Sequence, residues 1–285
     1  MEFQFIKGGR FLMGTDDKIG FSGDYEGPAT SVFVSDFEIA TTTVSNQDFA
    51  TFVQQTGYQT LAERKGNSFV FHLFIEETKR SHYPHPAGAP WWKVVPGTDW
   101  AHPYGPTSSI QGLEDHPVVH MALEDAFAYC RWAGLHLPTE AQWEYAARAG
   151  NTTTYPWGQE LVDEKGHHAN TWQGAFPWEN SQDDGFIGTA PVTYFEPNQF
   201  GLYQMIGNVW EWCCNPRYTL LEDFNRRPFE LTDEILGEEY AIRGGSFLCH
   251  SSYCNRYRVA ARNGSHIQST TSHLGFRCIR EVTHD

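Results

Sequence analysis

The sequence predicts an α+β fold, built as a single loop-rich domain with little regular secondary structure. Composition is the first indication: the 285 residues include 26 Gly, 15 Pro and 10 Trp, so turns are frequent and aromatic side chains supply much of the packing. Hydrophobic residues make up 40% of the chain and charged residues only 19%, which is enough apolar material for a sizeable core. No repeat, low-complexity tract or linker divides the chain, and residues 1–285 are therefore read as one domain.

Three helices are expected in the first 150 residues. The first begins after the N-cap Ser45 and ends at Gly57, which can adopt the left-handed conformation that stops a helix. The second spans residues 124–133, where apolar side chains recur at helical spacing. The third begins after Thr139, which has the capping-box partner Gln three residues later, and ends at Gly150.

Three short strands are expected in the second half of the chain, at residues 192–195, 240–243 and 275–280. Clusters of Gly, Asn, Asp and Pro separate these apolar or aromatic pieces and predict long loops. Such loops carry backbone polar groups that no regular ladder satisfies. Bound metal ions are one way to hold them in place.

Charge and hydropathy exclude several classes of protein. The 35 acidic and 20 basic residues give a net charge of −15, the wrong sign for a protein that follows a phosphate backbone, so nucleic acid is not expected as a partner. There is no run of about 18 apolar residues, and residues 1–7 lack the charged-then-apolar pattern of a signal sequence. We therefore expect a cytoplasmic monomer that has no membrane partner.

Two of the six cysteines, Cys249 and Cys254, lie five residues apart in an arginine-rich segment. Arg243, Arg256 and Arg258 are expected to favour the thiolate form of both. Such a pair can form a disulfide, bind a soft metal ion, or act as nucleophile and resolving thiol. Zinc is disfavoured, because a structural zinc site needs four ligands and no second Cys-x-x-Cys pair completes one. The alternative is that both cysteines are buried as small hydrophobic side chains, and the spacing does not decide between these readings.

Motifs spread over nearly the whole chain resemble, in kind and order, the formylglycine-generating enzyme (sulfatase-modifying factor) family. They are Gly8-Gly9-x-Phe11-x-Met13-Gly14, Pro90-Trp91-Trp92, Trp100-x-His102-Pro103, Asp115-His116-Pro117-Val118, Leu137-Pro138-Thr139-Glu140-Ala141-x-Trp143-Glu144-Tyr145, Gly207-Asn208-Val209-Trp210-Glu211-Trp212, Gly244-Gly245-Ser246 and Leu274-Gly275-Phe276-Arg277-Cys278. The broader superfamily, including sulfoxide synthases and members without catalytic cysteines, shares several of these motifs. The pair Cys249 and Cys254 with Ser246 is the part that resembles the true oxidases. The resemblance implies the C-type-lectin-like fold of this family.

The resemblance also implies an activity. It is the oxidation of a cysteine, in a Cys-x-Pro-x-Arg motif of a substrate polypeptide such as a type I sulfatase, to Cα-formylglycine with molecular oxygen and an external reductant. It implies that Cys249 and Cys254 hold Cu(I), a soft ion that suits thiolates, and that the substrate thiol becomes a third sulfur ligand. Ser246 matches the active-site serine of the family, and Trp212 is expected to place its ring near the site. The alternative is a non-catalytic polypeptide-binding module on the same fold.

Calcium is the second metal that the resemblance implies, as two structural ions. Without the resemblance, the residues involved would be read as turn formers and one buried carboxylate. The implied ligands of the first site are Asn170, Thr171, Asp184 and Phe186, and those of the second are Ile206, Gly207, Val209 and Glu211. Calcium accepts such mixed sets of side-chain and backbone oxygens.

Four further cysteines and the histidines could form disulfides or bind metal. Cys130 and Cys278 match a disulfide of some family members, a pair that a reducing compartment would keep as thiols. Cys213 and Cys214 have no counterpart, and both are expected to pack as buried hydrophobic side chains. A three-histidine iron site, as in the sulfoxide-synthase branch, is disfavoured because that branch carries an additional helical domain that these 285 residues leave no room for.

Overall fold

The computed structural model describes residues 1–225 and 235–282. Its α-helices are α1 (Asn46–Thr56), α2 (Leu61–Lys65), α3 (Glu77–Arg80), α4 (Leu123–Ala133) and α5 (Glu140–Arg148). Its strands are β1 (Phe3–Ile6), β2 (Gly9–Met13), β3 (Thr30–Val34), β4 (Phe37–Ala40), β5 (Asn67–Phe71), β6 (Trp92–Pro96), β7 (Val162–Asp163), β8 (Gly166–His167), β9 (Trp210–Pro216), β10 (Glu239–Arg243), β11 (Asn263–His266), β12 (Leu274–Phe276) and β13 (Ile279–Glu281). Long loops connect these short elements. None of the helices in the described part of the chain is long and apolar enough to cross a bilayer.

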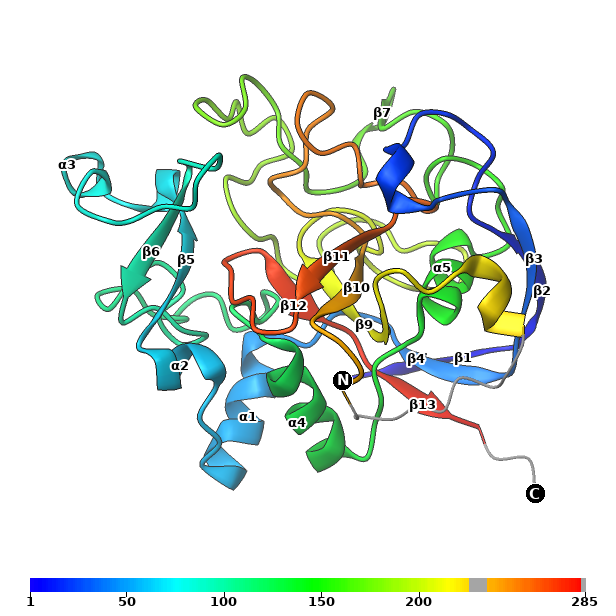
Figure 1. Ribbon diagram of the computed structural model, residues 1–285, viewed down its shortest axis with the longest axis horizontal. Coiled ribbons are helices and arrows are strands. Elements are labelled where there is room, and N and C mark those ends of the chain that lie inside the picture. The colour runs from blue at the N-terminus through cyan, green and yellow to red at the C-terminus, as the bar shows by residue number, and fades with distance from the viewer. Residues whose placement is uncertain (226–234, 283–285) are drawn as a thin grey trace.

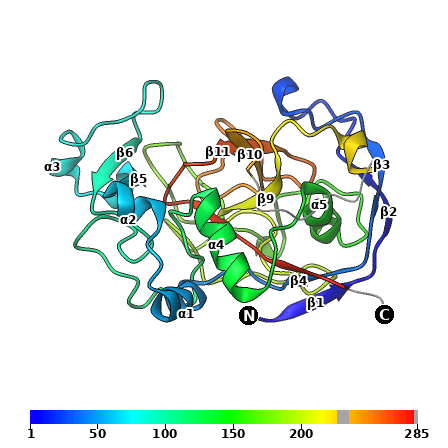
Figure 2. The ribbon, with the colours of Figure 1, turned by 60° about the horizontal axis from the view of Figure 1, so that its bottom comes forward.

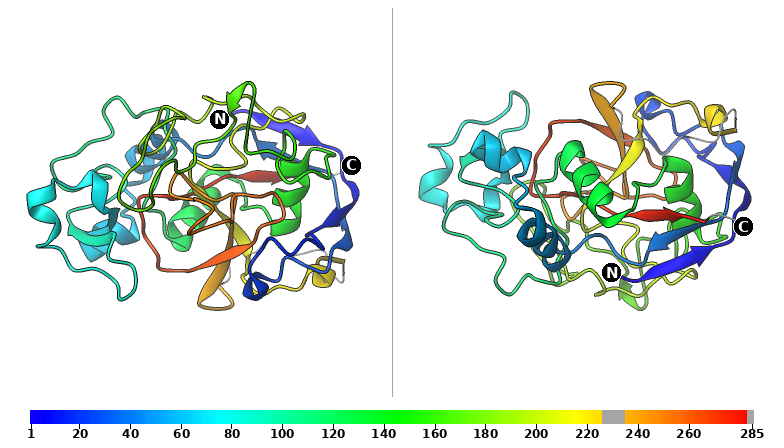
Figure 3. Two further views of the ribbon diagram at one scale, coloured as in Figure 1. Left: turned by 90° about the horizontal axis from the view of Figure 1, so that it is seen from above. Right: turned by 90° about the horizontal axis from the view of Figure 1, so that it is seen from below.

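A four-stranded sheet in the order β11-β10-β9-β12 occupies the centre of the molecule (Figure 1). β12 runs parallel to β9, whereas the other neighbours are antiparallel. A three-stranded sheet, β1-β4-β13, lies beside it, and α4 passes across the front in the view of Figure 2. The hairpin β5–β6 with α2 and α3 lies at one end of the long axis, and β2–β3 lies at the other (Figure 3).

The three predicted helices are present and end where local sequence predicts, with one small difference. α1 follows the N-cap Ser45, whose side chain and that of the third helical residue form a capping box, and ends at Gly57 with φ of 67°. α4 covers the predicted 124–133, and α5 follows the N-cap Thr139. The last helix ends before Gly150, because Ala149 already adopts the left-handed conformation with φ of 46°.

The strand predictions were correct in part. Residues 240–243 belong to β10, but residues 275–280 divide between β12 and β13, because the chain there leaves the central sheet and joins β4. The prediction of a strand at residues 192–195 was wrong. This segment follows Pro191 and forms a turn, in which the amide of Tyr194 donates to the Pro191 carbonyl at 3.0 Å.

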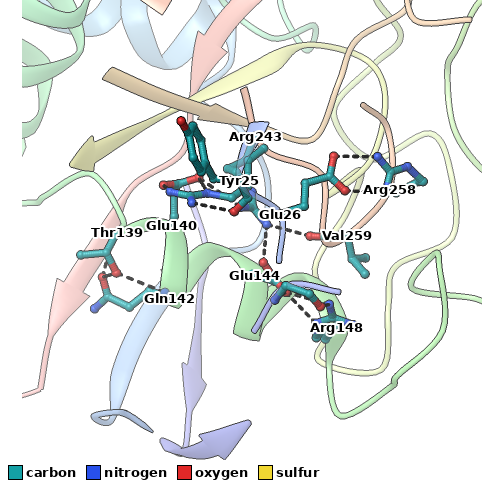
Figure 4. A network of polar contacts seen from close by, with 12 residues as sticks. Tyr25, Glu26, Thr139, Glu140, Gln142, Glu144, Arg148, Arg243, Arg258 and Val259 are labelled. Carbon is teal, nitrogen blue, oxygen red and sulfur yellow. Dashed lines mark hydrogen bonds and ion pairs between the residues drawn. The ribbon is translucent and has the colours of Figure 1, made fainter. Parts of the chain in front are cut away.

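Buried ion pairs connect α5 to the central sheet and to the loops around it (Figure 4). Glu140 accepts hydrogen bonds from Arg243 at 3.1 Å and from Arg262 at 2.9 and 2.5 Å. Glu144, one helical turn later, accepts from Arg243 at 2.6 Å and from Arg148 at 2.7 Å. All five side chains are buried. Because buried charges are costly without partners, this network fixes where α5 and β10 meet.

The histidine that precedes α4, His120, makes the stability of the fold depend on pH. It is fully buried, its Nδ1 is 2.7 Å from Ser68 Oγ, and its Nε2 is 2.9 Å from the Pro103 carbonyl. Burial lowers the pKa of His120 to about 4, against about 6.5 in an unfolded chain. The unfolded state therefore takes up a proton first as pH falls, and the stability that this group contributes is complete above pH 6.5 and is lost toward pH 4.

Replacing His120 by Asn, a residue that tolerates the observed φ of 63°, should remove this pH dependence. The expected size is about 2 kcal/mol less change in the free energy of unfolding between pH 7.5 and pH 5 than in the wild type. Urea unfolding of both proteins at the two pH values measures it. An identical pH dependence in the two proteins would show that other groups cause the acid sensitivity.

Candidate active site

The two cysteines of the predicted pair lie on one turn that follows β10. Gly244 and Gly245 lead into this turn with φ of 93° and 77°, and a Cβ on Gly245 would lie 2.9 Å from a neighbouring side-chain atom, so glycine is required there. The amide of Cys254 donates to the His250 carbonyl at 2.7 Å and closes the turn. As a result, the Sγ atoms of Cys249 and Cys254 are 3.0 Å apart.

The two thiols are buried and electrostatically unequal. Cys249 is 2% exposed and Cys254 is 7% exposed, and both are free. The hydrogen bond from Cys249, together with hydrogen bonding and charge from Arg256, lowers the pKa of the Cys254 thiol. Burial raises the pKa of the Cys249 thiol. A proton shared by the pair therefore rests on Cys249, and Cys254 is the first to become a thiolate.

Of the three arginines that were expected to favour the thiolates, one interacts directly with the pair. Arg256 lies beside Cys254 and is held by Asp24 through bonds of 2.5 and 3.1 Å. Arg258 is committed to Glu26 through bonds of 2.8 and 2.7 Å, and Arg243 to the carboxylates of α5 (Figure 4). The prediction for Arg243 and Arg258 was therefore wrong, because buried carboxylates neutralise both side chains.

Ser246 lies at the base of the cysteine turn and is fully buried. Its carbonyl accepts a hydrogen bond from the Cys249 amide at 2.9 Å. Its Oγ accepts one from the Leu248 amide at 3.3 Å and lies 3.0 Å from Nδ1 of His273. No pattern in the sequence marks His273, which is 27 positions away and becomes a neighbour only through the pairing of β12 with β9.

Trp212, the fourth residue assigned to catalysis, lies on β9 and is fully buried. Its indole donates to the Met121 carbonyl at 2.9 Å, and its backbone is in register with Phe276 of β12. These contacts place Trp212 in the core of the central sheet. Its role in catalysis stays a prediction.

An aromatic wall formed by Trp91, Phe176 and Tyr253 lies beside the thiols. The rings of Phe176 and Tyr253 stack with centroids 4.4 Å apart, and Trp91 meets Tyr253 edge-on at 5.2 Å. Tyr253 directly precedes Cys254 and is 43% exposed, so the wall reaches the surface. Sequence reasoning missed Phe176 and Tyr253, although the position of Tyr253 inside the cysteine segment was an available signal.

Three of the four residues predicted for the first calcium site are joined by hydrogen bonds, and the fourth, Asn170, directly precedes Thr171. The Asp184 carboxylate accepts hydrogen bonds from the amides of Thr171 and Phe186, both at 3.0 Å. Asn170 is fully buried, its Nδ2 donates to the Gly188 carbonyl at 2.7 Å, and its Oδ1 has no hydrogen-bond partner within the described chain. Burial raises the pKa of Asp184. The unpartnered buried oxygen of Asn170, next in sequence to Thr171, and the Asp184 carboxylate are oxygen donors of the kind that a hard cation such as calcium prefers.

The residues predicted for the second calcium site fit less directly. Ile206, Gly207 and Val209 are buried in the segment before β9. Both carboxylate oxygens of Glu211 already accept hydrogen bonds, one from Trp143 at 2.8 Å and both from Arg277 at 3.0 Å. Gln204, which the sequence analysis did not consider, has a buried Oε1 without a partner among the described residues. A cation here would therefore rely on backbone oxygens rather than on a free carboxylate.

The other four cysteines form no disulfide in the structure. Cys130 of α4 and Cys278 are buried, with their sulfurs 3.7 Å apart, so the pair predicted from the resemblance is adjacent but present as thiols. Cys213 is fully buried, as expected for a hydrophobic side chain. Cys214 is only partly buried, because successive residues of β9 point to opposite faces, and desolvation raises the pKa of its thiol to about 12.

Within the described ranges, no group of three or more His, Cys, Asp or Glu side chains is arranged to hold a metal ion. The predicted copper pair would offer only two sulfurs, and the predicted calcium sites would depend largely on neutral oxygens, so neither would count as such a group. His168 lies 2.9 Å from Asp163 and stacks on Trp157.

Fold and site together define an α+β protein that presents two adjacent buried thiols next to a partly exposed aromatic wall, the kind of site found in thiol and soft-metal oxidoreductases. Residues 2–282 match the family model of the sulfatase-modifying factor enzyme 1-like domain. The chain therefore belongs to the formylglycine-generating enzyme family of sulfatase-modifying factors.

Individual relatives agree with this assignment. The chain is 48% identical to the formylglycine-generating enzyme of Thermomonospora curvata, over 96% of this chain and 91% of that protein. It is 40% identical to inactive C-alpha-formylglycine-generating enzyme 2 of Mus musculus, over 96% and 83%. The structure of PvdO from Pseudomonas aeruginosa superposes with a TM-score of 0.69 at 24% identity, covering 98% of this chain and 94% of that one, which confirms the fold. The higher identity is to the enzyme, and the prediction of an enzyme is confirmed.

Proposed function

We propose that this protein oxidises a cysteine in a Cys-x-Pro-x-Arg motif of a sulfatase or similar polypeptide to Cα-formylglycine, using molecular oxygen and Cu(I). The observation that carries the proposal is the thiol pair: two buried sulfurs 3.0 Å apart, one with a lowered pKa, next to a partly exposed aromatic wall. The second candidate, a non-catalytic binding module, has no observation of its own in its favour.

Cys249 and Cys254 would hold the copper ion. Two soft sulfur donors favour Cu(I) over hard or borderline cations. Because the pair supplies only two ligands, a substrate thiolate could bind as the third. When bound, copper supplies the one-electron chemistry with oxygen that amino-acid side chains lack.

The overall reaction balances with an external thiol as reductant. A substrate CH₂–SH group, O₂ and two further thiols give an aldehyde, H₂S, one disulfide and water. The β-carbon is oxidised by two electrons, the external thiols supply the other two, and oxygen accepts all four.

The remaining residues of the site would bind and orient the peptide. The stacked rings of Phe176 and Tyr253 offer an apolar surface for the backbone and side chains around the substrate cysteine. Both sulfurs are themselves buried, which limits the access of water to the reacting thiol. Arg256, fixed by Asp24, keeps positive charge next to the Cys254 sulfur.

The test is an aldehyde assay. The protein, loaded with Cu(I), is mixed with a Cys-x-Pro-x-Arg peptide, oxygen and a thiol reductant, and the product is trapped with a hydrazide and weighed by mass spectrometry. The matched control is the same peptide with Ser in place of Cys. Tight peptide binding without any aldehyde would favour the binding module instead.

We also propose that calcium stabilises the loops around Asn170 and Asp184. Chelation should lower the melting temperature on the order of 5 °C, because a ligand that binds only the native state adds its binding free energy to folding. The variant Asp184→Asn should lose most of this sensitivity, whereas Asp183→Asn at the exposed neighbouring position should keep it. Differential scanning calorimetry with and without chelator measures the effect, and equal shifts in the two variants would count against the site.

A further inference from the structure

Trp178 has the most exposed ring of any Phe, Tyr or Trp in the described part of the chain. Its side chain is 66% exposed, whereas tryptophan in folded proteins is mostly buried. It follows Phe176 of the aromatic wall by two positions. Among the described residues, its ring contacts the ring of His72 and none of the three rings of the wall. Trp178 is therefore an apolar surface next to the wall that the proposed chemistry does not yet use.

The loop that carries Trp178 is anchored to the cysteine turn. The amide of Trp172 donates to the Cys249 carbonyl at 3.0 Å, directly before this loop begins. The amide of Ser181 donates to the Gln173 carbonyl at 3.1 Å and closes the loop. Within it, the amide of Trp178 donates to the carbonyl three positions earlier at 2.8 Å. The backbone of Trp178 is thus held by a closed loop that is hydrogen-bonded to the candidate site.

His72 connects the ring of Trp178 to the wall. His72 is buried, and its Nε2 lies 2.8 Å from the Pro177 carbonyl, which can only accept, so Nε2 carries the proton. The backbone amide of His72 donates to the carbonyl of Trp91, a member of the wall, at 2.8 Å. The imidazole meets the Trp178 ring edge-on, with centroids 5.2 Å apart and an interplanar angle of 77°. The exposed indole is therefore held in place before a ligand arrives, which lowers the entropy cost of binding.

We propose that Trp178 is a specificity-determining residue: its exposed ring binds an apolar side chain of the substrate polypeptide outside the Cys-x-Pro-x-Arg motif. This inference rests on the proposed function and deepens it. The substrate cysteine must reach the buried sulfurs beside Tyr253, so the residues next to it meet the wall. Trp178, whose ring is separate from the wall, is left for a residue further along the substrate chain. A large, rigid indole suits an apolar partner such as Leu, and tryptophan is enriched among the residues that dominate binding energy.

The test compares peptides that differ only outside the motif. A reference peptide carries the motif between Ser and Gly residues, and a series places one Leu at each position within about four residues on either side. In the wild type, Leu at one position or more should lower KM for aldehyde formation. Trp178→Ala should raise KM for those peptides about 10-fold with kcat unchanged, because the contact is the same in the ground and transition states. Trp178→Phe should stay within about 3-fold of the wild type, because it keeps an aromatic face. A wild type indifferent to Leu at every position, or an equal loss for the reference peptide, would overturn the proposal.

A control variant and a binding measurement complete the test. Phe33→Ala removes another exposed ring, 52% exposed, from β3 at the opposite end of the long axis from the β5–β6 hairpin that leads into His72, and it should leave every KM unchanged (Figure 3). Fluorescence anisotropy with labelled peptides that carry Ser in place of Cys measures Kd without turnover, and Trp178→Ala should raise Kd for the same Leu peptides. A Kd that depends on Trp178 in a protein that forms no aldehyde would refute the proposed function and support this inference. Aldehyde formation with equal KM values in the wild type and Trp178→Ala would do the reverse.

Discussion

Replacing Cys249 by Ser, or Cys254 by Ala, is expected to lower the rate of aldehyde formation about 1000-fold or more. The two sulfurs lie 3.0 Å apart and act as one unit, and removal of either member of such a unit costs nearly as much as removal of both. A serine oxygen is a hard donor that does not replace a thiolate toward Cu(I), and an alanine offers no donor. The hydrazide-trapping assay at saturating copper measures the effect. Substantial turnover in either variant would contradict the assignment of copper to this pair.

Cys214→Ser is the matched control, because Cys214 is a partly buried cysteine on β9 outside the cysteine turn. It should retain wild-type activity and bind one equivalent of Cu(I) per chain. The two active-site variants should bind less than a tenth of that amount after dialysis, as measured by metal analysis. Full copper binding by Cys249→Ser together with lost activity would mean that the metal is held elsewhere.

The parts of this fold that could be predicted are those that short stretches of sequence determine. The helix ends at Ser45, Gly57 and Thr139 follow from hydrogen bonds between residues three or four apart, which is why capping patterns located them. The strand predicted at 192–195 failed for the opposite reason. An apolar run forms a strand only when a partner strand is available, and Pro191 with the neighbouring turn leaves this one without a ladder.

The candidate site also has one part that local sequence predicts and another that depends on long-range contacts. Cys249, Cys254 and Ser246 are close in sequence and were predicted from their resemblance to a family. His273 and Phe176 reach the site from segments 24 and 73 positions away from Cys249, and no local pattern marks them. The expectation that Arg243 would serve the thiols failed because its partners, Glu140 and Glu144, lie about 100 positions earlier and become visible only after α5 packs on β10.

Those same long-range partners lead to the largest expected effect on stability. Glu140→Ala should lower the free energy of unfolding by about 3 to 5 kcal/mol, because it leaves the guanidinium groups of Arg243 and Arg262 buried without their shared carboxylate. Burial opposes ionisation of Glu140, but Arg262 and Arg243 outweigh it and lower its pKa, so the carboxylate is charged near neutral pH. Urea unfolding near pH 7 measures the loss.

The contrasting variant is Glu38→Gln, which removes an ion pair with Arg280 of similar length, 2.8 Å, but at the surface. Its expected cost is below about 1 kcal/mol, since exposed pairs gain little after solvation and side-chain entropy. Comparable losses for the two variants would show that Glu140 acts through packing rather than through compensation of buried charge.

Because β10 leads directly into Gly244 and the cysteine turn, Glu140→Ala should also lower aldehyde formation at temperatures where the protein is still folded. If Glu140→Ala loses stability as predicted but keeps wild-type activity, the position of the cysteine turn does not depend on this ion pair.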